Sequence, residues 1–73
     1  MPKVPPIKRK EFVRKLKALG FDGPFAGGKH EFLRRNDGLK ITIPNPHQKE
    51  ISGVLQKIIL TQADISVEEF LKI

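Results

Sequence analysis

The residues of this sequence that are best suited to chemistry lie around His30. The chain has no cysteine, and its two histidines, His30 and His47, are too far apart in the sequence to suggest a metal site. No two carboxylates have a spacing typical of an acid–base pair, and Gly27-Gly28-Lys29 is too short for a phosphate-binding loop of the Walker type. We therefore expect no metal and no cofactor, and His30 remains the candidate for acid–base chemistry near neutral pH.

The neighbours of His30 indicate a substrate for that chemistry. In an extended strand, side-chain alternation puts His30, Phe32 and Arg34 on one face. Leu33 falls on the other face as the natural core residue, so the first three should face solvent. Phe32 could stack on a base, Lys29 and Arg34 could bind phosphates, and an imidazole can take the proton from a ribose 2′-OH. This arrangement is compatible with metal-independent cleavage of RNA, in which the 2′-OH attacks the adjacent phosphate.

Each of these residues also has an ordinary structural interpretation. A single exposed histidine in a strand usually has no catalytic role, and Phe32 could instead pack under the N-terminal segment or under a protein partner. His47, between Pro46 and Gln48, could be a surface residue or a substrate contact. A non-catalytic RNA-binding module and a protein-interaction module therefore stand beside the ribonuclease as alternatives.

The charge distribution favours a polyanionic partner. Fourteen Lys and Arg against eight Asp and Glu give a net charge of +6. Residues 1–49 hold twelve basic and four acidic residues, whereas residues 50–73 hold two and four. A domain with one basic side has the electrostatic signature of a nucleic-acid binder, although a lysine-rich helix face could also be merely solvated. The residues expected to contact RNA are Lys8, Lys10, Gly28, Lys29, Phe32 and Arg34.

Hydrophobic periodicity predicts the elements that position this face. An extended segment, Met1–Pro6, should lie over the surface and precede an amphipathic helix, Ile7–Leu19, that ends at Gly20. Three antiparallel strands should follow, joined by turns at Gly27-Gly28 and Asn36-Asp37-Gly38. The predicted strands are Phe21–Phe25, Lys29–Arg35 and Leu39–Ile43.

The C-terminal third is predicted to be helical. A second amphipathic helix should run from about Lys49 to Gln62. Its apolar stripe, expected to be core, consists of Ile51, Val54, Leu55, Ile58 and Ile59. Ser66 and Glu69 form a capping-box pair for a short last helix, with Val67, Phe70 and Leu71 turned inward. The sequence therefore predicts an α+β fold and a single domain over residues 1–73. Its three-stranded antiparallel sheet should carry both helices on one face and leave the other open.

Two features bear on the cellular compartment. The chain lacks cysteine, so no disulfide can supplement the core. Met1–Lys10 is basic and contains proline with no apolar run behind it, which predicts neither a signal peptide nor a membrane span. We expect a cytoplasmic protein that is monomeric when free.

The segment Gly28–Leu33 resembles the HicA toxin family, whose members carry a Gly-x-His sequence at the head of the second strand of a double-stranded-RNA-binding-like fold. The similarity covers nearly the whole chain. Its further segments are Pro5-Pro6, Ala18–Phe21, Ile41–Pro44, Lys49–Ile51 and Ile65–Leu71. Lys29 stands where many members have Ser, and His47 lies one position beyond the family's loop histidine, so no role is carried over to His47.

The resemblance implies a toxin of a toxin–antitoxin pair. Family members cut mRNA, use the strand histidine as the catalytic residue and are silenced by a HicB antitoxin that covers the active face. By this match His30 is the catalytic position, and the expected partners are mRNA and a HicB-like antitoxin.

Overall fold

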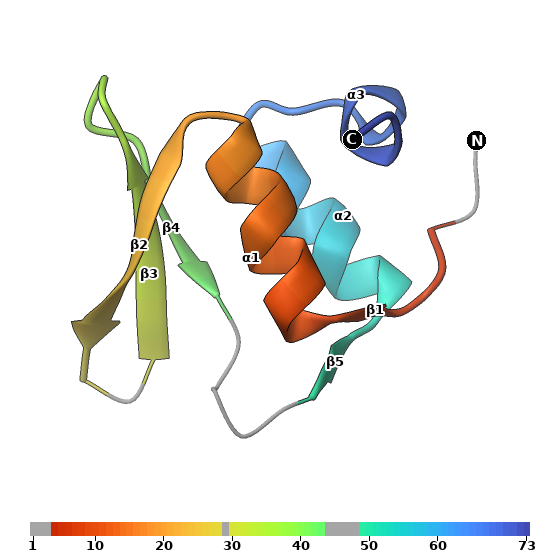
Figure 1. Cartoon of the computed structure of the whole chain (residues 1–73), viewed down its shortest axis with the longest axis horizontal. Helices are drawn as coiled ribbons and strands as arrows, with labels where there is room; N and C mark the ends of the chain where they lie inside the picture. The colour runs from red at the N-terminus through yellow and green to blue at the C-terminus, as the bar shows by residue number, and fades with distance from the viewer. Residues whose placement is uncertain (1–3, 29, 44–48) are drawn as a thin grey trace.

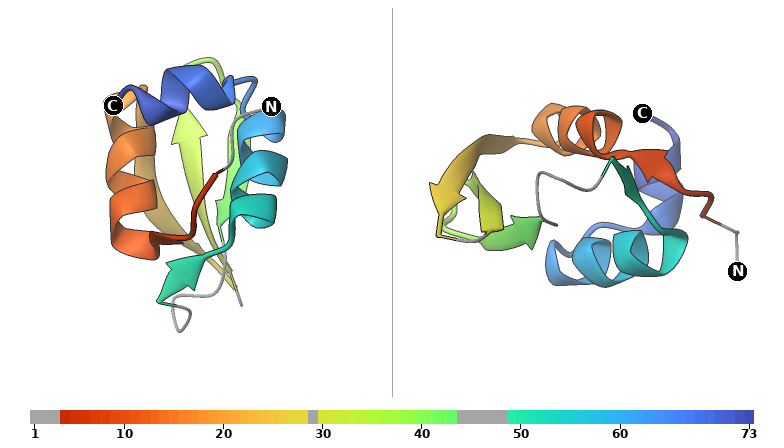
Figure 2. Two further views of the ribbon diagram at one scale, coloured as in Figure 1. Left: turned by 90° about the vertical axis from the view of Figure 1, so that its right-hand side faces the viewer. Right: turned by 90° about the horizontal axis from the view of Figure 1, so that it is seen from below.

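The computed structural model describes residues 4–28, 30–43 and 49–73. Its elements in chain order are β1 (Ile7–Lys8), α1 (Arg9–Ala18), β2 (Phe21–Gly27), β3 (His30–Arg35), β4 (Lys40–Ile43), β5 (Glu50–Ile51), α2 (Gly53–Gln62) and α3 (Val67–Leu71). Strands β2, β3 and β4 form an antiparallel sheet in that order, and α1 and α2 both lie on one side of it (Figures 1 and 2). The predicted α+β fold, with its α-β-β-β-α order and short C-terminal helix, is therefore confirmed.

The face of the sheet under the helices forms the core. Side-chain alternation in β3 and β4 sends Leu33, Ile41 and Ile43 to this side, where each is at most 1% exposed. The helices contribute the facing side chains Phe12, Leu16, Ile59 and Leu60. Burying an aliphatic or aromatic side chain of this size stabilises a fold by about 1.5–3 kcal/mol. In a chain of 73 residues, this covered face therefore carries much of the stability.

A second, two-stranded sheet joins residues that the sequence analysis placed in helices. Ile7 pairs with Ile51 and Lys8 with Glu50 in antiparallel register. The first helix therefore begins at Arg9 and not at Ile7, and the second begins at Gly53, beyond its predicted start near Lys49. Both predicted boundaries were too early, because a two-residue strand is too short to show a period of two in the sequence.

The described part of the N-terminal segment packs against the start of α2. Val4 is 9% exposed, and a Cβ on Gly53 would come within 2.0 Å of the Val4 carbonyl oxygen, so only glycine fits there. Gln56 is 1% exposed, and its Nε2 donates hydrogen bonds to the carbonyls of Pro5 (2.8 Å) and Ile51 (3.0 Å). The expectation that this segment lies over the surface was wrong for Val4.

The buried face of α2 matches the predicted stripe only in part. Ile51 and Ile59 are buried in the core as predicted, and Leu55 packs against it. Val54 and Ile58 are 72% and 50% exposed, whereas Gln56 and Leu60 are buried. The helix starts after Ser52, whose hydroxyl accepts a hydrogen bond from the Leu55 amide.

The prediction of a core position was therefore wrong for Val54 and Ile58, and Ile51 is buried as predicted but lies in β5 and not in the helix. In α3, Phe70 is buried and Val67 half-buried as predicted, but Leu71 is 41% exposed and does not point inward. Ser66 caps this last helix, and its hydroxyl accepts a hydrogen bond from the Glu69 amide.

Strand β2, at one edge of the sheet, contains a bulge. Asp22 pairs with Arg34 and Phe25 with Phe32, so three steps along β2 match two steps along β3. Gly23 lies within the bulge with φ of +125°, a conformation that favours glycine. The extra residue shifts the side-chain alternation, so that Phe21 lies under the helices and Phe25 on the opposite face.

Candidate functional site

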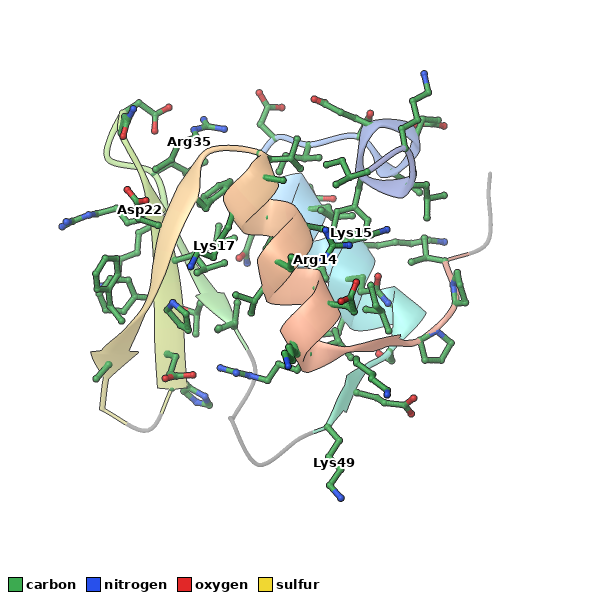
Figure 3. All side chains as sticks on the ribbon, viewed as in Figure 1. Arg14, Lys15, Lys17, Asp22, Arg35 and Lys49 are labelled. Carbon is green, nitrogen blue, oxygen red and sulfur yellow. The ribbon has the colours of Figure 1, made fainter. Side chains whose placement is uncertain are left out.

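The face of the sheet away from the helices, which we call the open face, carries the predicted strand residues. His30 and Arg34 are exposed and Phe32 is half-buried, whereas Leu33 between them is fully buried. The strand register adds four more side chains to this face. These are Asp22 and Phe25 of β2, and Lys40 and Thr42 of β4. Figure 3 shows Asp22 on the side of the sheet away from α1, while Arg35 lies on the helix side.

At the centre of the open face, Phe25 and Phe32 form an aromatic pair. Their ring centroids are 5.5 Å apart and the rings are tilted by 37°. The Arg34 guanidinium lies 5.5 Å from the Phe25 ring centroid, and the Lys40 ammonium lies 4.2 Å from that of Phe32. The aromatic pair is therefore flanked by two cations. A ring face exposed beside positive charge suits the stacking of a nucleic-acid base whose phosphate lies next to it.

His30 begins β3, at the end of the open face nearest the turn from β2. It pairs with Gly27 across the strands, and Gly28, with φ of +81°, forms part of the turn. Within the described residues, no side chain or backbone group hydrogen-bonds to the imidazole, and His30 is exposed to solvent. Lys29 and His47 lie outside the described residues.

Glu31 extends to the other side of the sheet from its neighbour His30. Its carboxylate accepts a hydrogen bond from the Arg9 guanidinium at the start of α1, and the two form an ion pair whose side chains are 16% and 30% exposed. The pair joins the first helical turn to the strand residue next to His30. It therefore fixes the start of β3 relative to α1.

The predicted RNA contacts Lys8 and Lys10 do not lie on the open face. They line a cavity of about 750 Å³ between the start of α1, the bulge of β2 and β5, which we call the basic pocket. Its described lining residues are Lys8, Arg9, Lys10 and Lys49, with Val13, Pro24 and Glu50. The structure therefore divides the predicted RNA-binding residues into two groups, one around the aromatic pair and one in this pocket.

Comparison with known families connects this geometry to a function. Residues 9–65 match the family model described as the HicA toxin of bacterial toxin–antitoxin systems. The chain belongs to the HicA toxin family. Membership indicates a toxin role and a cognate antitoxin as the partner. The matched residues run from α1 past α2 and include the whole open face of this HicA domain. No curated protein matches the chain.

Sequence reasoning missed three residues that this HicA structure brings into the two groups. Phe25 pairs with Phe32 only because of the bulge in β2, and no pattern in the sequence predicts that bulge. Lys40 lies in the predicted strand Leu39–Ile43 but was given no role, because its neighbour across the sheet was unknown. Lys49 was assigned to a helix, whereas it lies in the lining of the basic pocket. The alternation of charge and apolar residues in β4 was the one signal that could have pointed to Lys40.

The turn from β3 to β4 is ordered by its own charges. The Arg35 guanidinium forms an ion pair with Asp37 at 2.8 Å, and Asp37 Oδ1 accepts a hydrogen bond from the Leu39 amide at 3.1 Å. The bonds from Arg35 and from the Leu39 amide lower the pKa of Asp37 from 3.8 to about 2. Arg35 also lies 5.5 Å from the Phe21 ring centroid. These contacts hold the end of the hairpin opposite His30.

Two further properties concern metal ions and membranes. Within residues 4–28, 30–43 and 49–73, no three His, Asp or Glu side chains gather in a way that could hold a metal ion. None of the helices in the same part of the chain has the length and hydropathy needed to cross a bilayer.

Proposed function

We propose that this HicA family toxin is an endoribonuclease that cuts mRNA without a metal ion, and that His30 is its general acid–base. The observation that carries the proposal is the row along β3 of an exposed imidazole, an aromatic ring and a cation, on a sheet face that none of the described helices covers. An unpaired RNA base stacked on the aromatic pair would place its sugar and phosphates beside these groups.

The reaction needs a proton acceptor for the ribose 2′-OH and positive charge for the phosphate. His30 removes the proton, and the 2′-oxygen attacks the adjacent phosphorus. The bond from phosphorus to the 5′-oxygen breaks, which leaves a 2′,3′-cyclic phosphate on one product and a 5′-OH on the other. The imidazolium or a water molecule supplies the proton for the departing oxygen. Arg34, together with Lys29, stabilises the charge on the phosphate oxygens.

The antitoxin part of the proposal follows from the same face. A HicB-like antitoxin that covers the open face would bury the aromatic pair and His30 and so exclude RNA. Aromatic rings and arginine on an exposed face are typical of the centre of protein interfaces, which suits such an inhibitor. The free toxin is proposed to be a monomer of one domain in the cytoplasm, where mRNA is available.

The test compares the purified protein with the His30→Ala variant on a long single-stranded RNA in EDTA. We expect the parent protein to cut the RNA and His30→Ala to cut it at least about 100-fold more slowly, because general acid–base catalysis contributes that much. Binding of the RNA by His30→Ala should persist in a native gel. DNA of the same sequence should stay intact, because it lacks the 2′-OH.

The control variant is Lys57→Ala, on α2 and away from the open face, which should cut at the parental rate. A chain that shifts RNA in a native gel but leaves it intact in both parent and variant would be an RNA-binding module without catalysis, and the catalytic assignment of His30 would be wrong.

A further inference from the structure

We propose that the basic pocket is a second RNA site, which binds a backbone phosphate of the same strand whose base stacks on the aromatic pair. The inference deepens the proposed function, because it takes RNA as the substrate and adds that the strand must be single and several nucleotides long. It also assigns Lys8, Lys10 and Lys49 to this site and separates them from the residues of the open face.

The lysines of the pocket are available to an anion. Within the described residues, no carboxylate lies within ion-pair distance of the ammonium groups of Lys8, Lys10 or Lys49, and all three residues are exposed. Arg9 is already paired with Glu31. Glu50, across from Lys8 in the β1–β5 pair, is the only carboxylate in the described lining. The pocket therefore presents three lysine charges that form no ion pair with a described carboxylate, and only Lys10 has a longer-range attraction to the neighbouring Glu11 among the described residues.

The shape and walls of the pocket suit a nucleotide unit better than a free ion. Its volume of about 750 Å³ exceeds what a phosphate alone would fill, and Val13 and Pro24 provide an apolar wall for a ribose. The first turn of α1 also begins here, and its N-cap residue Lys8 offers no side-chain acceptor to the helix amides. The positive end of the helix adds to the attraction of the lysines for an anion.

The bulge in β2 connects the pocket to the aromatic pair. Pro24 lines the pocket, and the next residue, Phe25, contributes its ring to the open face. Since β2 is an edge strand, a chain can pass over it at the bulge without crossing another strand. Arg9, which lines the pocket, also forms an ion pair with Glu31, the residue that follows His30. This contact places the wall of the pocket close to the start of β3.

The start of β3, the end of β2, and β5 with Lys49 also lie at one end of the molecule (Figures 1 and 3). An RNA strand bound at both sites would therefore run past His30. Because a base that stacks on the aromatic pair must be unpaired, the substrate is single-stranded at this point.

The experiment measures binding of fluorescent oligouridylates by anisotropy, in the His30→Ala background so that the RNA stays intact. One probe has about 12 nucleotides and can reach both sites, while the other has about 3 and covers the aromatic pair alone. The pocket variant carries Lys8→Gln, Lys10→Gln and Lys49→Gln. The matched control carries Lys17→Gln, Lys57→Gln and Lys72→Gln, which remove the same charge outside the pocket lining.

We expect the pocket variant to bind the longer RNA about tenfold more weakly than the control variant. The slope of log K against log salt should fall by about 0.7 for each phosphate that the pocket variant no longer neutralises. The short RNA should bind both variants equally, and replacing the three pocket lysines with arginine should retain the affinity of the longer RNA. Thermal unfolding should give all variants similar midpoints, because the substituted side chains take no part in the core.

If the pocket and control variants bind the longer RNA equally weakly, only non-specific electrostatic attraction acts at the pocket. That result would overturn the second site and leave the proposed ribonuclease intact. A His30→Ala protein that binds neither RNA would overturn both proposals.

Discussion

The two faces of the three-stranded sheet differ although the same strands make both. On the covered face, Leu33 and its aliphatic neighbours contact the helices and are almost fully buried. On the open face, Phe32 contacts Phe25 and lies under a lysine ammonium, and no helix of the described part of the chain lies above it. The described N-terminal residues lie against α2, so Phe32 does not pack beneath them as one interpretation of the sequence allowed.

The difference shows how a small domain can separate stability from function. The two aromatic rings of the open face contact each other and the two flanking cations, but they contribute little to the core. Large apolar groups left exposed in this way usually mark a surface that meets a partner. The covered face should therefore respond to substitution by unfolding, and the open face by losing its ligand.

The largest effect is expected at the centre of the covered face. Leu33 is fully buried, so Leu33→Ala should lower the free energy of unfolding by about 2–5 kcal/mol, because apolar surface is no longer buried and a cavity remains. Urea denaturation followed by circular dichroism measures the change. Phe32→Ala, one position away, should lower the free energy of unfolding clearly less. An equal loss of unfolding free energy in the two variants would mean that both faces of the sheet contribute equally to stability.

A smaller effect, on binding and not on stability, is expected at the aromatic pair. Phe25→Ala and Phe32→Ala should each weaken RNA binding by about 1–3 kcal/mol, the range found when one base can no longer stack. Anisotropy with the longer oligouridylate measures it. The control is Thr42→Ala, a substitution on the same face that removes no ring and should leave affinity nearly unchanged. Unaltered binding in both Phe variants would place the RNA elsewhere.

The smallest effect concerns the turn between β3 and β4, at the far end from His30. Since the folded pKa of Asp37 lies below its ordinary value, its ionised carboxylate stabilises the fold above that value, and the stabilisation disappears as pH falls from 3.8 to about 2. Asp37→Asn should lower the unfolding midpoint slightly at neutral pH, because the pair with Arg35 is exposed to solvent.

Thermal scans across this pH range should show the parent and Asp37→Asn converging near the lower limit. Asp37→Ala also loses the acceptor for the Leu39 amide, so it should remain less stable than Asp37→Asn at every pH. A constant difference between the parent and Asp37→Asn down to the lowest pH would show that the charge of Asp37 is not what stabilises the turn.

The sequence was sufficient to predict the three strands and the face that holds His30, Phe32 and Arg34. Alternate residues of β3 and β4 are apolar, and this period of two indicates which side of each strand is buried. It was insufficient for Phe25. Counting in twos from the buried Phe21 would place Phe25 under the helices, and only the pairing with β3 reveals the extra residue in between. Bulges depend on the partner strand, so a pattern within one strand does not contain them.

The errors in α2 and in the short strands have a related cause. Apolar residues occur on several sides of α2, so its inward face depends on where the helix starts. That start is fixed by the pairing of Ile51 with Ile7, far away in the sequence. Gln56 is buried for the same reason, since the carbonyls it bonds belong to Pro5 and Ile51. No local rule would place a glutamine in the core.

The β1–β5 pair and the hydrogen bonds of Gln56 also constrain how the protein is made. Both join residues 5–8 to residues 50–56, so they form only after most of the chain has left the ribosome. The hairpins of β2, β3 and β4 need only local contacts and can form earlier during synthesis. A nascent or prematurely terminated chain that lacks α2 therefore contains the strand residues of the open face, but it cannot form the contacts that hold α1 over the covered face of the sheet.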